Sequence, residues 1–184
     1  MTGRGRQKHH AAGPPRLHGL LPIVSASTRV LILGSFPSTA SLRAQQYYAH
    51  PHNHFWKILQ AIWPEHRMAT GPDSYQKRSE WLLARGLGLW DVYASCERSG
   101  SLDSAIRNAQ VNDFASLKAR CPQLKLIVHN GGESYKHAGL VRHSLGVEDF
   151  AVLKLPSTSP ANASWSFERK LAAWRDAMSA AGLA

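Results

Sequence analysis

Hydrogen-bonding and aromatic side chains are concentrated between residues 45 and 56, in the stretch QQYYAHPHNHFW. This stretch follows a short apolar run, Val30–Leu33, whose pattern is typical of a strand buried on both faces of a parallel sheet. The run stops at Gly34, and the turn SFPS follows at the carboxyl end of the expected strand. Open α/β sheets bind ligands at that edge. Amide, phenol and imidazole groups can stack on a flat heterocycle and hydrogen-bond to it, so we interpret the stretch as the wall of a nucleobase pocket.

The charge of the chain favours an acidic partner. The 184 residues include 22 Lys and Arg against 12 Asp and Glu, which gives a formal net charge of +10. Four of the basic residues lie in the first sixteen, where there is no acid, and the rest of the chain is still basic without them. Nucleic acid is the first partner that we expect, and a membrane surface is the second.

Composition divides the chain into a tail and a domain. Residues 1–16 are rich in Gly, Pro, Arg and His and have almost no apolar content, so we expect a disordered basic tail, either inert or weakly attracted to a polyanion. Residues 17–184 should form a single domain. Cys96 and Cys121 are too few for a disulfide framework or a four-cysteine iron–sulfur cluster. With no apparent signal peptide or membrane-spanning segment, we expect a cytoplasmic monomer that does not use a membrane.

Hydrophobic periodicity predicts an α/β fold. Strands are expected at 30–33, 87–93, 124–129 and 150–155, and helices at 53–63, 73–85, 101–108, 112–120, 133–143 and 165–181. Strands separated by helices indicate a four-stranded, mainly parallel sheet with helices on both faces. The carboxyl ends of such strands meet at one rim. The residues expected at this rim are Gly34, Ser35, Phe36, Asp91, Asn130 and Ser157.

Several segments together resemble the uracil-DNA glycosylase superfamily, and most closely its hypoxanthine (deoxyinosine) DNA glycosylase branch. They are GSFPS at 34–38, YYAHPHNHFW at 47–56, GLGLWDV at 86–92, GSLDSAIRN at 100–108 and LPSTSPANAS at 155–164. The resemblance covers most of residues 25–180. It implies a three-layer α/β/α sandwich, a catalytic domain without metal or other cofactor, and removal of a deaminated base from DNA.

The sequence departs from the better-known members of that superfamily at two positions. Those members carry Asp or Asn in the first motif to position the attacking water, and here the position is Phe36. Their second motif commonly opens with His or Asn, and here it opens with Leu155. The resemblance to the hypoxanthine branch instead assigns the water to Asn53. The local sequence alone favours a helix cap as the explanation of Asn53, and it is the resemblance that favours the water-positioning role.

The other predicted site residues fall into two groups. Residues expected to contact the extruded base are Gly34, Ser35, Phe36, Tyr48, Asp91 and Asn130. Residues expected to contact the DNA around it are Pro37, Ser38, His50, His54, Pro156, Ser157, Thr158 and Ser159. Small hydroxyl residues can bind phosphates, and backbone N–H groups after a strand can receive a base carbonyl.

Each of these assignments has an alternative. Phe36 and the tyrosines at 47 and 48 can be ordinary core residues, and Asp91 can cap a helix. Asn130, followed by two glycines, can belong to a plain turn, as can the residues at 156–160. The histidines at 50, 52 and 54 alternate as metal ligands do, but no cysteines or acids cluster beside them, so surface or DNA-backbone roles are preferred.

The expected reaction is hydrolysis of the N-glycosidic bond of deoxyinosine, which leaves an abasic site without cutting the strand. Its transition state has oxocarbenium character, so a positioned water, stabilisation of the departing base and exclusion of solvent all help. The alternatives are the same chemistry on uracil and a catalytically silent DNA-binding module. A phosphate-binding loop is disfavoured, because the 34–41 turn has one glycine and no lysine.

Overall fold

Four parallel strands form the centre of the fold, as the apolar runs predict. The computed structural model describes residues 14–71, 74–146 and 150–184. The strands are β2 (Val30–Gly34), β3 (Leu87–Asp91), β6 (Leu126–Asn130) and β7 (Ala151–Leu155), in the order β3-β2-β6-β7. All residues of β2, β3 and β6 are buried, whereas the edge strand β7 is partly exposed. Continuous apolar runs suit the first three strands because helices cover both of their faces.

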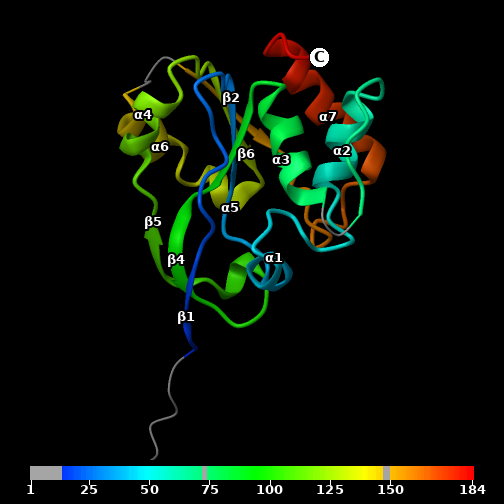
Figure 1. Cartoon of the computed structure of the whole chain (residues 1–184). Coiled ribbons are helices and arrows are strands. Elements are labelled where there is room, and N and C mark those ends of the chain that lie inside the picture. The colour runs from blue at the N-terminus through cyan, green and yellow to red at the C-terminus, as the bar shows by residue number, and fades with distance from the viewer. Residues whose placement is uncertain (1–13, 72–73, 147–149) are drawn as a thin grey trace, which may run out of the picture.

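Helices cover the sheet on both sides (Figure 1). On one side are α2 (Phe55–Ile62), α3 (Tyr75–Leu83) and α7 (Phe167–Ala180), and on the other are α4 (Leu117–Arg120) and α6 (Ala138–Leu145). Helix α2 buries Phe55, Ile58, Leu59 and Ile62, which recur at the 3–4 spacing of an amphipathic helix. The three-layer α/β/α sandwich is therefore confirmed. No helix in the described ranges has both the length and the apolar character needed to cross a bilayer.

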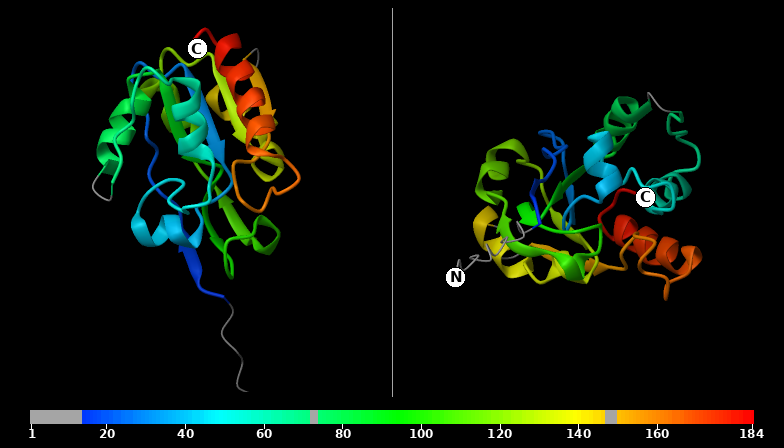
Figure 2. Two further views of the ribbon diagram at one scale, coloured as in Figure 1. Left: turned by 90° about the vertical axis from the view of Figure 1, so that its right-hand side faces the viewer. Right: turned by 90° about the horizontal axis from the view of Figure 1, so that it is seen from below.

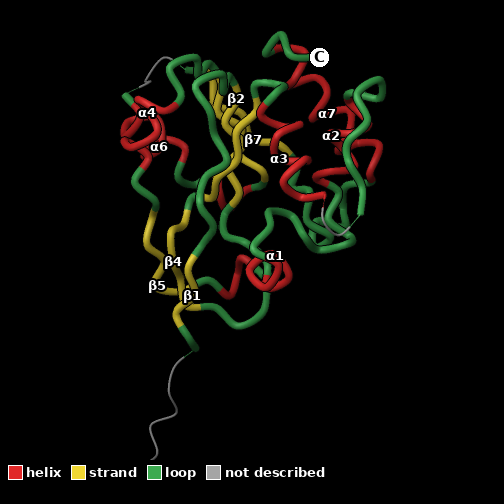
Figure 3. Tube along the Cα trace, in the orientation of Figure 1, coloured by secondary structure: helices red, strands yellow, loops and turns green. Residues whose placement is uncertain are grey.

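A second sheet was not expected from the sequence. It is antiparallel and consists of β1 (Arg16–His18), β4 (Tyr93–Glu97) and β5 (Arg107–Val111), in the order β1-β4-β5. Figure 3 shows it below the parallel sheet. Arg16 forms an ion pair with Glu97 at 3.7 Å and donates hydrogen bonds to the Ser95 hydroxyl. The predicted disordered tail is thus wrong for Arg16, and its residues 1–13 lie outside the described residues.

Two predicted helices differ from the structure. The helix expected at 101–108 is wrong: a single 3-10 turn, η2 (Asp103–Ala105), leads directly into β5. Pairing with β4 supplies backbone hydrogen bonds that the local sequence does not signal. The helix expected at 133–143 is divided into α5 (Gly132–Tyr135) and α6, and the Tyr93 hydroxyl contacts Glu133 of α5 and His137 in the break. The helix expected at 112–120 forms as η3 (Phe114–Ser116) followed by α4.

The four parallel strands end at one rim, as predicted. Their last residues are Gly34, Asp91, Asn130 and Leu155. In the register of the sheet Gly34 lies beside Asp91, and Asn130 lies beside Leu155. Helix α1 (Thr39–Ala44) and the turn after β7 lie at the same end of the molecule (Figure 2).

Candidate active site

A cavity of about 750 Å³ opens at this rim. Its lining combines the turn after β2, the 47–53 segment, the ends of β3 and β6, the turn after β7 and residues 101–104. All of the predicted site residues line it except His50 and His54. The fold therefore assembles in one place most of the residues that the sequence singles out from five separate segments.

The floor of the cavity contains a buried acid. Asp91 is only 4% exposed, and its Oδ2 atom has no hydrogen-bond partner among the described residues. Burial, with the nearby charge of Asp103, raises the pKa of this carboxyl to about 7, although the Arg98 guanidinium opposes the rise. Asp91 is a cavity residue and caps no helix, so near neutral pH the site holds a carboxyl group poised between its acid and carboxylate forms.

Asn130 connects the two walls of the cavity. Its amide nitrogen donates to the Tyr48 hydroxyl at 3.1 Å and to the Thr158 hydroxyl at 3.0 Å, and its Oδ1 accepts the Thr158 backbone N–H at 2.9 Å. These bonds use both amide hydrogens of Asn130, so in this structure its side chain holds the two walls of the pocket together. Thr158 is fully buried, and its predicted contact with a phosphate is therefore wrong.

Tyr48 forms an aromatic wall. Its ring stacks on Phe55 with centroids 4.0 Å apart and an interplanar angle of 24°. Its hydroxyl accepts from Asn130, so its own proton remains available for a ligand. Burial and the nearby Asp91 raise the pKa of Tyr48, which keeps the hydroxyl protonated. Tyr47, in contrast, is 3% exposed and its hydroxyl reaches the backbone carbonyls of residues 20 and 21, as expected for a core residue.

Asn53 lines the cavity immediately before helix α2. Its side chain is half-buried, and its Oδ1 accepts the backbone N–H of Phe55 at 2.9 Å. The N-cap position of α2 is His54, so Asn53 caps the helix from one residue earlier, through this bond to the first helical N–H. A carbonyl oxygen has two lone pairs, so the same atom can also accept a hydrogen bond from a water in the cavity. The two interpretations of Asn53 are compatible.

The turn after β2 is supported from below by an arginine that the sequence did not single out. Arg98 is 3% exposed, lies with its guanidinium 5.0 Å from the Phe36 ring centroid and donates to the Pro37 carbonyl. Phe36 is itself 6% exposed, so much of its ring is core. The Ser38 hydroxyl accepts the Ser41 backbone N–H as the N-cap of α1.

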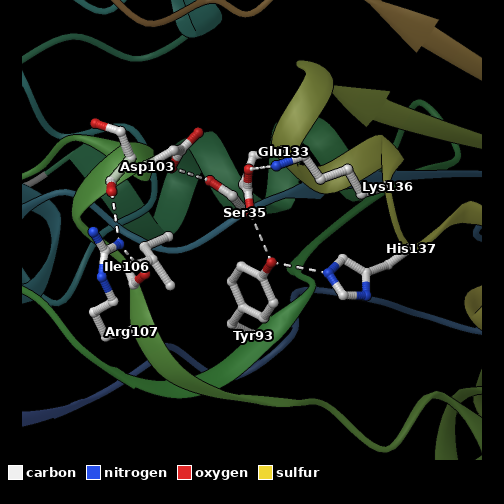
Figure 4. A network of polar contacts seen from close by, with 9 residues as sticks. Ser35, Tyr93, Asp103, Ile106, Arg107, Glu133, Lys136 and His137 are labelled. Carbon is white, nitrogen blue, oxygen red and sulfur yellow. Dashed lines mark hydrogen bonds and ion pairs between the residues drawn. The ribbon is translucent and has the colours of Figure 1, made fainter.

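A polar network extends the site beyond the cavity (Figure 4). The Ser35 hydroxyl donates to Asp103 at 2.6 Å. Tyr93 donates to Glu133 at 2.8 Å, and its oxygen lies 2.8 Å from Nε2 of His137. Asp103 lines the cavity but was not predicted as a site residue. The only sequence signal for it was its position within the segment 100–108.

Helix α7 holds the turn after β7. Trp174 donates from its indole to the Pro156 carbonyl at 3.1 Å, and Lys170 donates to the Ser159 carbonyl at 3.2 Å. Lys170 is 1% exposed, and burial lowers the pKa of its ammonium group. Within the turn, the Ser157 hydroxyl accepts the Ser159 backbone N–H. This support fixes the turn against the cavity.

The histidines of the 50–54 segment lie outside the cavity lining. Nδ1 of His50 accepts the His52 backbone N–H. The His54 ring packs edge-on against the Phe167 ring, with ring centroids 5.3 Å apart. The His54 backbone N–H donates to the Thr158 carbonyl, which ties this segment to the turn after β7. DNA contacts of His50 and His54 stay predictions. Among the described residues, no group of three His, Cys, Asp or Glu side chains could hold a metal ion.

The fold and the cavity define an α/β protein with a ligand site at the carboxyl rim of a parallel sheet. Residues 21–178 match the model of the uracil DNA glycosylase superfamily, and the chain belongs to this family. A solution NMR structure of a candidate uracil DNA glycosylase from Methanosarcina acetivorans superposes with a TM-score of 0.74 at 34% identity, over 91% of this chain and 99% of that one. The similarity in fold therefore extends over nearly all of both chains.

Two relatives carry a more specific name. A hypoxanthine DNA glycosylase from Methanosarcina barkeri is 36% identical over 159 residues, which cover 86% of this chain and 96% of that protein. A hypoxanthine DNA glycosylase from Methanosarcina acetivorans is 38% identical over 152 residues, which cover 83% and 92%. The family resemblance that the motifs indicated is confirmed.

Proposed function

We propose that this protein excises hypoxanthine from DNA by hydrolysing the N-glycosidic bond of deoxyinosine, leaving an abasic site. The observation that carries this proposal is a rim cavity in which a half-buried amide, Asn53, shares its walls with a buried acid, Asp91, and an aromatic side chain, Tyr48. The names of the two similar proteins agree with it. An extruded purine can be stacked, hydrogen-bonded and attacked by water in such a site.

Asn53 is proposed to orient the attacking water. An amide is too weak a base to deprotonate water, but bond breaking runs ahead of attack when the sugar has oxocarbenium character. A water held on the free lone pair of Oδ1 then needs only to be in position. The hydrogen bond from Phe55 fixes the direction of the amide group and so pre-orients that lone pair.

Asp91 and Tyr48 are proposed to bind the base. Hypoxanthine presents a carbonyl oxygen and an N1–H group on its Watson–Crick edge, where adenine presents an amino group and an unprotonated nitrogen. The Tyr48 hydroxyl and the acid form of Asp91 are hydrogen-bond donors, as the developing negative charge on the departing base requires. The backbone N–H groups of Ser35 and Phe36 are further candidate donors.

The turn after β7 is proposed to bind the DNA on either side of the extruded nucleotide. Ser157, Ser159 and Lys154 all line the cavity. The backbone of this turn is fixed by α7, so phosphate contacts would cost little ordering.

A labelled duplex with one hypoxanthine, treated with the protein and then with alkali, tests the proposal. A break at that position, absent from normal duplex, is the expected result. A second duplex with uracil in the same place separates the proposed substrate from uracil. A protein that binds both duplexes but releases neither base would be the catalytically silent module, and the proposal would then fail.

A further inference from the structure

The charges that line the cavity do not suit the reaction proposed above. Within the described ranges, its charged side chains are two acids, Asp91 and Asp103, and one base, the exposed Lys154. Release of a base leaves negative charge on the departing purine, and that charge is stabilised by positive groups and hydrogen-bond donors close to it. The lining itself is short of positive charge.

A buried cation lies directly behind this lining. Arg98 follows the last residue of β4 and is 3% exposed. Its guanidinium lies 5.0 Å from the centroid of the Phe36 ring and donates to the Pro37 carbonyl, and both of these residues line the cavity. Arg98 is therefore separated from the ligand space only by the turn after β2.

Arg98 lacks the partners that normally accompany a buried charge. In the part of the chain that the structure describes, it forms no ion pair, and its Nε and Nη1 atoms have no hydrogen-bond partner. Oδ2 of Asp91 is buried without a partner as well. A buried charge with unpaired donors is costly, so its presence beside the cavity calls for an explanation.

The charge of Arg98 reaches into the cavity. Charges that interact through a buried region are screened far less than charges in water. The guanidinium accordingly lowers the pKa of the Asp91 carboxyl against the larger effect of burial, and the charge of Asp103 raises it. The phenols that feel the charge of Asp91 stay protonated, because burial raises the pKa of each of them, namely Tyr47, Tyr48 and Tyr75.

We propose that Arg98 is a positioning residue for base release, whose buried charge offsets the acids of the cavity and stabilises the negative charge that develops on the departing base. This inference rests on the proposed base-excision function. The guanidinium acts from behind the turn without touching the base, so it takes up no room in the cavity. Its bond to the Pro37 carbonyl also holds the turn whose Ser35 and Phe36 N–H groups are candidate donors to the base.

The test measures single-turnover release of hypoxanthine from a duplex, as a function of pH, for the wild type, R98M and R98K. Methionine fills much of the space without a charge, so R98M should release base about tenfold more slowly on the acid side of the pH profile. Without the guanidinium, Asp91 keeps its proton to higher pH, so the fall in rate should begin at a higher pH in R98M than in the wild type. R98K keeps the charge and should keep most of the rate and the wild-type pH of the fall.

D103N should change the pH profile in the opposite direction. Asp103 is exposed, and an asparagine can still accept the hydrogen bond from the Ser35 hydroxyl, so the local structure should persist. Loss of the carboxylate removes a charge that raises the pKa of Asp91, so the fall should begin at a lower pH than in the wild type. A loosened pocket would slow the reaction at every pH and would leave the pH of the fall unchanged.

R85M is the matched control. The Arg85 guanidinium also packs on an aromatic ring, 3.7 Å from the Trp81 centroid, and donates to a backbone carbonyl, that of Trp81, at 2.9 Å. Arg85 lies outside the cavity lining, so R85M should have the wild-type rate and pH profile.

Two results would overturn the proposal. One is an R98M profile whose fall stays at the wild-type pH. The other is an R98K protein that is as slow as R98M while D103N leaves the profile unchanged, which indicates a structural role for the arginine.

A wild-type protein that releases no base at any pH would overturn the proposed function instead. The carbon-13 chemical shift of the Asp91 carboxyl, assigned with D91N, then reports its titration without any reaction. A midpoint that rises in R98M and falls in D103N would support the action of the Arg98 charge on the cavity. Equal midpoints in R98M and the wild type would overturn it.

Discussion

The carboxyl group of Asp91 occupies the space that a side chain on Gly34 would need. The two residues end adjacent parallel strands and lie side by side in the register of the sheet. The buried acid can therefore approach the backbone of β2 only because residue 34 has no Cβ. Gly34 and Asp91 both line the cavity, and the missing side chain at Gly34 fixes the position that the Asp91 carboxyl can take.

Replacing Gly34 by alanine should displace the Asp91 carboxyl. We expect G34A to release base at least about tenfold more slowly, because a small misplacement of a group at the reacting base has large effects on rate. DNA affinity should change little, as measured by fluorescence anisotropy. The control is G139A, since a Cβ at Gly139 in α6 would meet no atom within 4 Å. An unchanged rate in G34A would mean that the position of Asp91 does not matter for base release.

The buried acid should make stability depend on pH. The pKa of Asp91 is about 7 in the folded protein against an ordinary value of 3.8, so the folded state keeps a proton that the unfolded chain releases. Its contribution to stability is full below the unfolded pKa and is lost as the pH rises through the folded pKa. In urea unfolding, the wild type should therefore lose about 2 to 3 kcal/mol relative to D91N between pH 5 and pH 8. If the free energy of unfolding changed with pH in the same way for the wild type and D91N, the raised pKa of Asp91 would be contradicted.

The same group should control the rate of base release. The acid form of Asp91 can donate a hydrogen bond to the departing base, whereas the carboxylate would repel its developing negative charge. Base release under single-turnover conditions should therefore fall as the pH rises above about 7. The amide of D91N stays neutral and can still donate a hydrogen bond, so the rate of base release by D91N should not fall over this pH range. If D91N shows the same fall, another group titrates.

Asn53 should be essential for catalysis through its oxygen. N53A removes both the cap and the proposed water site, so we expect loss of base release with nearly unchanged DNA affinity. Loss of the Phe55 hydrogen bond should lower stability by about 1 kcal/mol. N53D keeps the oxygen that caps α2 and should restore the stability, and part of the activity if orientation of the water is what matters. An N53A protein that releases base at the wild-type rate would exclude this mechanism.

The sequence predicts the parts of the fold that depend on local patterns. The apolar runs at β2, β3 and β6 need two buried faces, so the parallel sheet and the shared rim of Gly34, Asp91 and Asn130 follow from them. The hydroxyl of Thr158 was misassigned because residue type does not show which way a side chain points from a turn.

The unpredicted parts depend on contacts between distant segments. Strand β5 forms because an edge of β4 is available to pair with it. Arg98 is a buried charge whose partner, the carbonyl of Pro37, lies 61 residues away in the sequence, and Lys170 is a buried charge that donates to the Ser159 carbonyl in the turn before its own helix. Charged residues of these types are mostly exposed, so their sequence gives no sign of burial.

Lys170 provides the last test, because replacing it should affect both the stability of the fold and the conformation of the turn after β7. Its ammonium group donates to the Ser159 carbonyl from a position that is 1% exposed. K170A would leave both a cavity and an unpaired carbonyl, and should lower the free energy of unfolding by about 2 to 4 kcal/mol. K170M fills the space without donating, so its stability should lie much closer to that of the wild type, while its DNA affinity falls because the turn is no longer held. Thermal unfolding and anisotropy separate the two effects. Equal DNA affinity of K170M and the wild type would show that packing alone fixes the turn.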